Sequence, residues 1–136
     1  MNASFRIDPN IDKIAKAYAL DAIDIALRNF GITLDWSDKS IQLVEDMLGQ
    51  LHDSLADTKP PEDTVWVFAK SFGSYLGEVF CKNHGGTWGI VRLEDDEFPG
   101  IQDKKGGLFW PWARARKRIL NGPEENVWHY YQINLR

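Results

Sequence analysis

Cysteine is almost absent from this chain of 136 residues, which contains only Cys81. A single cysteine can form neither an intramolecular disulfide nor a cysteine-based zinc cage. This usage is compatible with a reducing compartment. The N-terminal residues show no basic stretch followed by an apolar run, and no apolar run approaches the roughly 18 residues of a membrane span. We therefore expect a cytoplasmic protein with no signal peptide and no membrane partner.

Motifs that bind metals or phosphates are also missing. The histidines His52, His84 and His129 are scattered and belong to no paired metal-binding motif. The acidic run Glu94–Glu97 lacks the alternating ligands and central glycine of a calcium-binding loop. Gly85-Gly86 follows a predicted helix and precedes a predicted strand, which reverses the order found in a phosphate-binding loop. We therefore expect neither a metal ion nor a cofactor.

The chain has an acidic excess, with a net charge of −4. Residues 1–64 hold 12 acidic and 6 basic side chains, whereas residues 65–136 hold 8 and 10. Because nucleic-acid binding relies on clustered lysine and arginine, we expect no nucleic-acid partner. One concentration of positive charge is present, and we interpret it as a solvated helix face. Its members are Lys104, Lys105, Arg114, Arg116, Lys117 and Arg118.

Apolar residues at three- and four-residue steps predict helices over 10–30, 38–56 and 62–84. Gly31 is placed to end the first helix, and Pro60-Pro61 ends the second. Because about six residues join these two helices, we expect them to pack antiparallel as a hairpin. The second helix has a regular apolar stripe that is predicted to face the core: Ile41, Val44, Leu48, Leu51 and Leu55.

The third predicted helix is the most hydrophobic, and we expect it at the centre of the fold. Gly73 and Gly77 stand four residues apart within it. Glycine inside a helix costs roughly 1 kcal/mol relative to alanine. We therefore expect these two glycines to permit the close approach of another backbone, from a helix or from the sheet.

The apolar pattern then changes to the alternation of a strand over Thr87–Leu93. The acidic run Glu94–Glu97 interrupts this strand, and Phe98–Ile101 is interpreted as a loop or a short edge strand. Leu108–Trp110 is predicted to be the returning strand. Two short helices are predicted to follow, over Trp112–Asn121 and Glu124–Leu135.

These elements predict an α+β fold. Three N-terminal helices would pack on a small antiparallel sheet of two or three strands, with one or two short C-terminal helices. A sheet of that size is not stable alone, so it must lie against the third helix. With 43% apolar and 26% charged residues, the chain is expected to form a single domain over residues 1–136.

Cys81 and His84 are neighbours on one predicted helix, so we considered them as a catalytic pair. Nucleophilic catalysis by cysteine needs a base and a third group that orients the base, and the sequence indicates no such third group. We favour a buried thiol and a histidine that supports the helix end. No catalytic residue is predicted.

Tryptophan is unusually frequent, with six residues. Tryptophan fills cores and is also enriched at interaction sites. We expect most of the six in the core. At least one of Trp110 and Trp112 should lie near the surface, because the chain turns from strand to helix between them.

Four short motifs carry a resemblance: Gly77-Glu78, Gly86-Thr87-Trp88, Phe109-Trp110-Pro111 and Arg118–Gly122. In this order they resemble a bacterial domain family of unknown function, built as helices followed by a short β-hairpin, over about residues 65–135. The resemblance implies a bacterial protein of the toxin-immunity type.

The leading hypothesis is a non-enzymatic bacterial protein that binds another protein, as an immunity or inhibitor protein for a basic toxin. An acidic balance would speed association with a basic partner. We place the binding surface on the acidic run and the aromatic segment that follows the sheet. Its predicted residues are Glu94, Asp95, Asp96, Glu97, Trp110, Trp112 and Arg114.

The alternative is a small-molecule-binding or enzymatic domain with a pocket between the third helix and the sheet. Its polar residues would be Glu78, Lys82, His84 and Arg92. A deep pocket into which at least two of these side chains point would favour this alternative. A third possibility is a small structural protein that self-associates.

Overall fold

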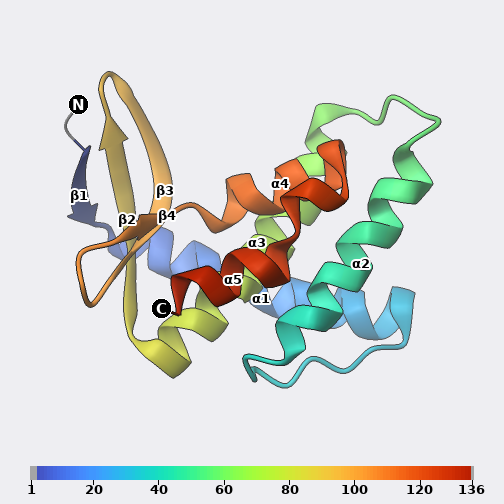
Figure 1. Ribbon diagram of the computed structural model, residues 1–136, viewed down its shortest axis with the longest axis horizontal. Helices are drawn as coiled ribbons and strands as arrows, with labels where there is room; N and C mark the ends of the chain where they lie inside the picture. Colours follow the sequence, from blue (N-terminus) through green and yellow to red (C-terminus); the bar gives the residue numbers. More distant parts are fainter. Residues whose placement is uncertain (1–2, 136) are drawn as a thin grey trace.

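The computed structural model describes residues 3–135 and has the α+β fold that the sequence predicts (Figure 1). Helices make up most of the described chain, and one antiparallel sheet lies at one end of them. The elements are β1 (Ala3–Ile7), α1 (Pro9–Phe30), α2 (Ser40–Leu55), α3 (Glu62–His84), β2 (Gly86–Leu93), β3 (Asp96–Asp103), β4 (Leu108–Phe109), α4 (Pro111–Asn121), a 3₁₀ turn (Pro123–Glu125) and α5 (Val127–Asn134).

The predicted positions of the helices are confirmed to within a few residues. Helix α1 ends at Gly31, whose φ of 66° is the left-handed conformation that favours glycine. The stripe of α2 faces the core as expected: Ile41, Val44 and Leu48 are fully buried, whereas Leu51 and Leu55 are half-buried. Within residues 3–135, no helix combines the length and apolar character that crossing a bilayer requires.

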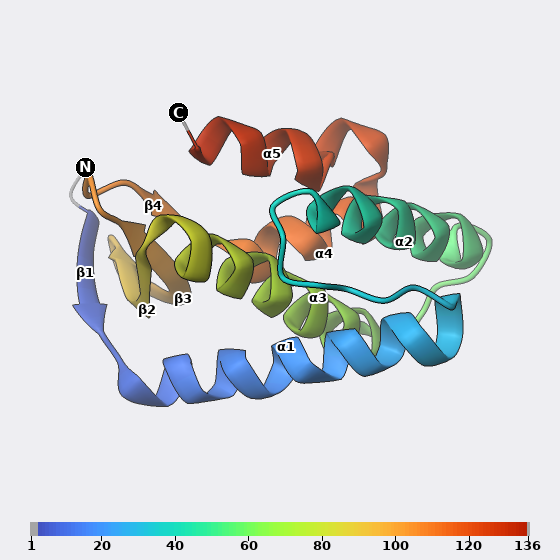
Figure 2. The same ribbon diagram turned by 90° about the horizontal axis from the view of Figure 1, so that it is seen from below.

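Helix α3 lies at the centre, as its hydrophobicity predicts, and ten consecutive residues from Ser71 to Phe80 are buried. Figure 2 shows α1 on one side of α3 and α2 with α5 on the other. The prediction that α1 and α2 form a hairpin is therefore wrong. The segment 31–39 runs back along α3 instead, because the Tyr75 hydroxyl accepts the Trp36 N–H at 2.9 Å and fixes the segment there.

The sheet is a four-stranded antiparallel meander in the order β1-β2-β3-β4, rather than two or three strands. Strand β1 was not predicted, and it pairs with β2 from Ala3 opposite Leu93 to Ile7 opposite Gly89. The interpretation of Phe98–Ile101 as a loop or a short edge strand is also corrected. Only Glu94 and Asp95 form the turn, so β3 runs unbroken and pairs with β2 along its whole length.

The two glycines of α3 let the sheet and α4 approach closely. A Cβ on Gly73 would stand 2.7 Å from the carbonyl oxygen of Pro111, so this position admits the backbone of α4, as expected. A Cβ on Gly77 would stand 2.3 Å from Trp88 and 2.8 Å from Ile101. Gly77 therefore admits side chains of the inner face of the sheet rather than a backbone. The predicted contact between the sheet and the third helix is confirmed.

The interpretation of the positive charges as a solvated helix face is wrong for Arg118, whereas Arg114 and Arg116 are partly exposed and hold ion pairs. Arg114 pairs with Glu125 at 2.8 Å, and Arg116 pairs with Glu62. Arg118 is buried, and its Nε donates to both carboxylate oxygens of Glu45, at 3.0 and 2.8 Å. Glu45 also accepts the N–H of Val127 at 2.9 Å, so this one carboxylate joins α2, α4 and the start of α5.

Candidate functional site

The outer face of the sheet, on the side away from α3, is apolar. Directly opposite residues of an antiparallel pair point to the same side, and Phe98 lies opposite Val91. A Cβ on Gly100 would meet Val91 at 3.0 Å and the Trp110 ring at 3.4 Å, which places Trp110 on this side too. An antiparallel sheet normally presents polar residues to water. This face therefore has the composition of a contact surface.

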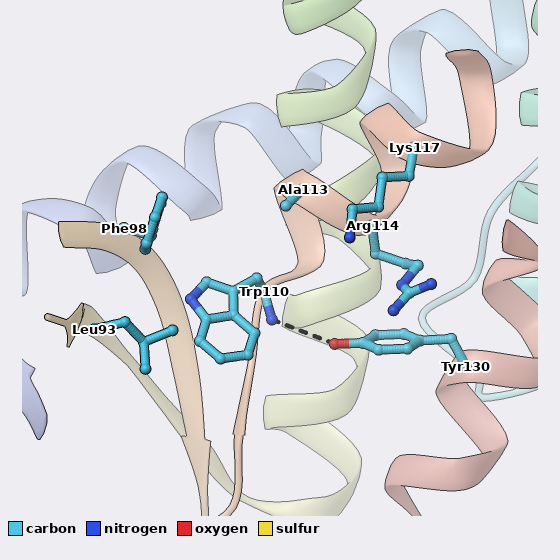
Figure 3. Close-up of a pocket in the computed structure, with 7 residues that line it drawn as sticks. All are labelled: Leu93, Phe98, Trp110, Ala113, Arg114, Lys117 and Tyr130. Carbon is cyan, nitrogen blue, oxygen red and sulfur yellow. Dashed lines mark hydrogen bonds between the residues drawn. The ribbon is translucent and has the colours of Figure 1, made fainter. Parts of the chain in front are cut away.

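A groove of about 230 Å³ lies where the outer face meets α4 and α5 (Figure 3). Leu93 and Phe98 lie on one side of the Trp110 ring, and the residues from the two helices lie on the other. Phe98 is 40% exposed, which is high for a phenylalanine in the middle of a strand. The lining residues are Leu93, Phe98, Trp110, Ala113, Arg114, Lys117 and Tyr130.

Hydrogen bonds and a cation–π contact fix the helical wall of the groove. The Trp110 backbone N–H donates to the Tyr130 hydroxyl at 3.3 Å. The Arg114 guanidinium lies 4.3 Å from the centre of the Tyr130 ring while it pairs with Glu125. Burial raises the pKa of Tyr130, so its hydroxyl stays protonated. The wall is therefore formed before any partner binds.

The acidic run is divided between two roles. Glu97 pairs with Arg6 at 3.4 Å and with Arg92 at 3.9 Å, so it supports the sheet. Glu94, Asp95 and Asp96 are exposed, and within the described residues no ion pair holds any of their carboxylates. These three side chains, which we call the acidic tip, stand next to Leu93 at one end of the groove.

Glu94 adopts a φ of 56°, a left-handed conformation that costs an L-residue roughly 1–2 kcal/mol. Glu94→Gly is therefore expected to raise the free energy of unfolding by about 1 kcal/mol, because glycine adopts this φ without a steric penalty. Urea unfolding followed by circular dichroism measures the change. Asp95→Gly is the matched control, since Asp95 has no positive φ. Equal effects of the two changes would contradict this account.

The predicted aromatic residues of the binding surface separate. Trp110 lines the groove, whereas Trp112 lies on the other side of the start of α4. The Trp112 indole N–H donates to the Ser74 hydroxyl at 2.7 Å, and its ring contacts Tyr18 edge-on. Trp112 is half-buried against the core, so it is not a wall of the groove. Of the six tryptophans, only Trp88 is fully buried.

The four polar residues of the alternative pocket do not come together. Glu78 is buried and accepts the indole N–H of Trp88 at 3.0 Å. Lys82 lies over the ring of Trp36, with its Nζ 5.1 Å from the ring centre. The remaining two residues also have separate partners: His84 contacts Asp38 at 2.8 Å, and Arg92 contacts Glu97. The space between α3 and the sheet is filled by Trp88, Ile101, Phe80 and Phe109.

His84 does have an orienting group, which the sequence did not indicate. The Asp38 carboxylate contacts the His84 Nε2 and also accepts from Tyr131 and Asn83. Burial opposes ionisation of Asp38, but these three hydrogen bonds outweigh it and lower the pKa of this carboxyl. The contacts join the start of α2 to the ends of α3 and α5. This arrangement indicates a structural role for His84.

Cys81 lacks the properties of a nucleophile, because burial raises the pKa of its thiol to about 12. We expect iodoacetamide at pH 8 to alkylate Cys81 at least about 100-fold more slowly in the folded protein than in urea, where the thiol pKa is about 8.5. The rate should still rise with pH above 9. Mass spectrometry of timed samples measures both rates. Equally fast alkylation of the folded protein would revive Cys81 as a reactive residue.

A larger cavity of about 400 Å³ lies between the α2–α3 loop and the end of α4. Two of its polar residues are already engaged within the fold. His52 contacts the carbonyl oxygen of Ile119 at 2.7 Å, and Glu62 pairs with Arg116. None of the predicted site residues lines this cavity. It therefore offers a weaker site than the groove.

Five residues of the groove were missed by the sequence analysis: Leu93, Phe98, Ala113, Lys117 and Tyr130. The available signal was the alternation of β3, where Phe98 and Gly100 share one face. That signal was hidden because the four acidic residues suggested an interruption of the strand, so that Phe98–Ile101 was interpreted as a loop or a short edge strand. Tyr130 and Lys117 carried no signal, since only the tertiary packing brings them to Trp110.

Comparisons with known proteins identify a solved structure with a similar fold, but they do not indicate a function. No protein-family model and no curated protein matches the chain. A crystal structure of a protein from Bacteroides thetaiotaomicron VPI-5482 has a similar fold, with a TM-score of 0.64 over 99% of this chain at 12% identity. The match covers 48% of the Bacteroides chain, so this chain spans about half its length. At this identity the likeness concerns the fold alone.

Proposed function

We propose that this chain is a cytoplasmic bacterial protein without enzymatic activity, which binds another protein through the groove and the acidic tip. The observation that carries the proposal is the apolar outer face of the sheet. Phe98 is an exposed aromatic residue of this face and the half-buried Trp110 lies beside it, next to three acidic side chains that no ion pair in the described fold engages. Protein interfaces typically combine aromatic residues in a well-packed core with a polar rim around it.

The size of the groove supports a protein partner over a small molecule. Pockets for small molecules usually enclose about 300–1,000 Å³ and surround most of the ligand. The groove is smaller, at about 230 Å³, and it is open to solvent. It suits one apolar side chain projecting from a larger surface. The acidic tip would speed association with a cationic partner and would do so most at low salt.

The finer part of the proposal is that the partner is a toxin and that this chain is its immunity or inhibitor protein. The resemblance of residues 65–135 to a bacterial family supplies this idea. Charge supports it, because the carboxylates of the acidic tip could cover the cationic surface of an enzyme that acts on nucleic acid or phosphate.

The test uses the products of the genes that flank this one, each purified and titrated with the chain by isothermal calorimetry. We expect one of them to bind and its toxicity in a bacterial host to be suppressed by co-expression. Phe98→Ser should weaken the complex by at least about ten-fold, since an aromatic anchor in a contact carries more than about 1 kcal/mol.

The matched control for that variant is Val67→Ser. Val67 is an apolar residue of α3 that is 53% exposed and lies outside the groove. The Val67→Ser variant should therefore bind the partner with the same affinity as the wild type. A partner that binds Phe98→Ser as tightly as the wild type would remove the groove from the interface. Binding without protection from toxicity would keep the binding function and reject the immunity class.

A further inference from the structure

The two ends of the groove carry opposite charges. The acidic tip stands beside Leu93 at the end formed by the β2–β3 turn. Lys117 lines the groove on the opposite side of Trp110 (Figure 3). Lys117 is exposed, and no ion pair joins it within residues 3–135. The second cation of the groove, Arg114, is already neutralised by Glu125 at 2.8 Å.

We infer that the groove binds a protein segment with three features in line: a cationic residue, an apolar anchor and a carboxylate. The cationic residue would lie against the acidic tip, the apolar side chain would contact Phe98 and Trp110, and the carboxylate would meet Lys117. This inference rests on the proposed function, and it specifies the chemistry of the partner segment at that same site.

Charge complementarity disfavours partner segments whose charges are all of one sign. A uniformly cationic segment would bring a positive side chain against Lys117, and a uniformly anionic one would bring a negative side chain against the acidic tip. Each mismatch costs free energy, because like charges brought into contact repel. Only a segment with opposite charges on the two sides of its apolar anchor meets both ends of the groove favourably.

The groove recognises side chains rather than adding a strand. β4 pairs only with Ile101 and Gln102, which leaves the edge of β3 uncovered by a strand over residues 96–100. Pro99 lies within that stretch and lacks the backbone N–H that a further strand would need. An incoming segment therefore finds fewer backbone partners at this edge and depends on the groove.

The test uses four capped heptapeptides with one phenylalanine anchor: KKGFGEE, EEGFGKK, KKGFGKK and EEGFGEE. Binding is followed by the NMR signal of the Trp110 indole N–H, identified by its loss in Trp110→Phe. At low salt, we expect one of the two bipolar peptides to bind about two- to five-fold more tightly than either uniform peptide, the range expected for a solvent-exposed ion pair. The better of the two bipolar peptides also gives the chain direction of the segment.

Lys117→Glu makes both ends of the groove acidic and should reverse the preference. The peptide KKGFGKK should then bind more tightly than either bipolar peptide. Lys13→Glu is the matched control, because Lys13 is exposed on α1, outside the groove, and the change alters the net charge equally. This control should retain the wild-type order of peptides.

Three results would overturn the inference: no peptide binding, equal binding of all four peptides, or a Lys117→Glu protein that behaves as the Lys13→Glu control. These outcomes are separable from failure of the proposed function. If a full-length partner still binds and Phe98→Ser still weakens it, the groove remains the interface and only the proposed charge pattern is wrong. If Phe98→Ser has no effect on that partner, the proposed function itself fails at this site.

Discussion

Leu48→Asp is expected to abolish the cooperative unfolding transition of this protein at 25 °C. Leu48 is fully buried on α2, within the apolar stripe that contains Val44 and Ile41. The aspartate would leave a charge among apolar side chains, which costs several kcal/mol in addition to the lost apolar burial. A domain of this size is stable by only about 5–15 kcal/mol. Thermal unfolding followed by circular dichroism shows whether a transition remains.

Leu43 provides the matched control for this change. It lies on the same helix five residues earlier, and it is 36% exposed. Leu43→Asp introduces the same side chain where water can solvate it, so its effect should stay within about 1 kcal/mol. If the two variants unfold at similar temperatures, the stripe does not face the core in solution.

Helices α1 and α2 could be predicted because their buried residues follow the helical period along the chain. Helix α3 was predicted at its observed bounds, since its apolar residues are frequent and Gly85-Gly86 follows it. The arrangement of the helices could not be predicted in the same way. The short link suggested a hairpin, but the contact of Trp36 with Tyr75 directs the chain back along α3. That contact joins residues far apart in sequence and leaves no local pattern.

The number and length of the strands in the sheet were underestimated for two local reasons. Strand β1 alternates apolar Ala3, Phe5 and Ile7 with polar Ser4 and Arg6, but an alternation of only five residues is a short signal, and the sequence analysis missed it. In β3, the acidic residues Asp96 and Glu97 suppress the strand pattern, although each is exposed and costs the sheet little. Cross-strand pairing of Glu97 with Arg6 and Arg92 compensates for the charge. Such charge compensation cannot be inferred from the sequence before the register of the strands is known.

Part of the candidate site could be predicted from the local sequence, whereas the rest of it depends on tertiary packing. The acidic residues and Trp110 could be recognised from composition and from their place after a strand. Phe98, Lys117 and Tyr130 lie beside Trp110 only through the packing of β3, α4 and α5. Trp112 shows the converse error. It is two residues from Trp110, but the first turn of α4 directs it towards Ser74 and Tyr18.

Arg118 shows that a cluster of like charges can conceal a buried pair. In the sequence it looks like part of a solvated basic helix face, but its side chain is 7% exposed and that of its partner Glu45 is 13% exposed. Its Nη1 has no hydrogen-bond partner. A Cβ on Gly49 would stand 2.8 Å from the Arg118 Nη2, so α2 makes room for the guanidinium. Breaking this pair should therefore lower the free energy of unfolding far more than breaking a surface pair does.

Arg118→Met is expected to lower the free energy of unfolding by about 3–5 kcal/mol, because it leaves the Glu45 carboxylate buried without its cation. Glu45→Gln keeps an acceptor for the Val127 N–H while it removes the charge. The double variant should be more stable than Arg118→Met alone, since neither buried charge then remains. Urea unfolding of the four proteins gives the coupling energy of the pair directly.

Arg116→Met is the internal reference, because Arg116 lies on the same helix and its pair with Glu62 is more exposed. Loss of the Arg116–Glu62 pair should lower the free energy of unfolding by no more than about 1 kcal/mol. If Arg118→Met costs no more than Arg116→Met, the buried pair contributes only what a surface pair does. If the effects of Arg118→Met and Glu45→Gln simply add, the two side chains are not coupled, and the junction of α2, α4 and α5 is held by apolar packing alone.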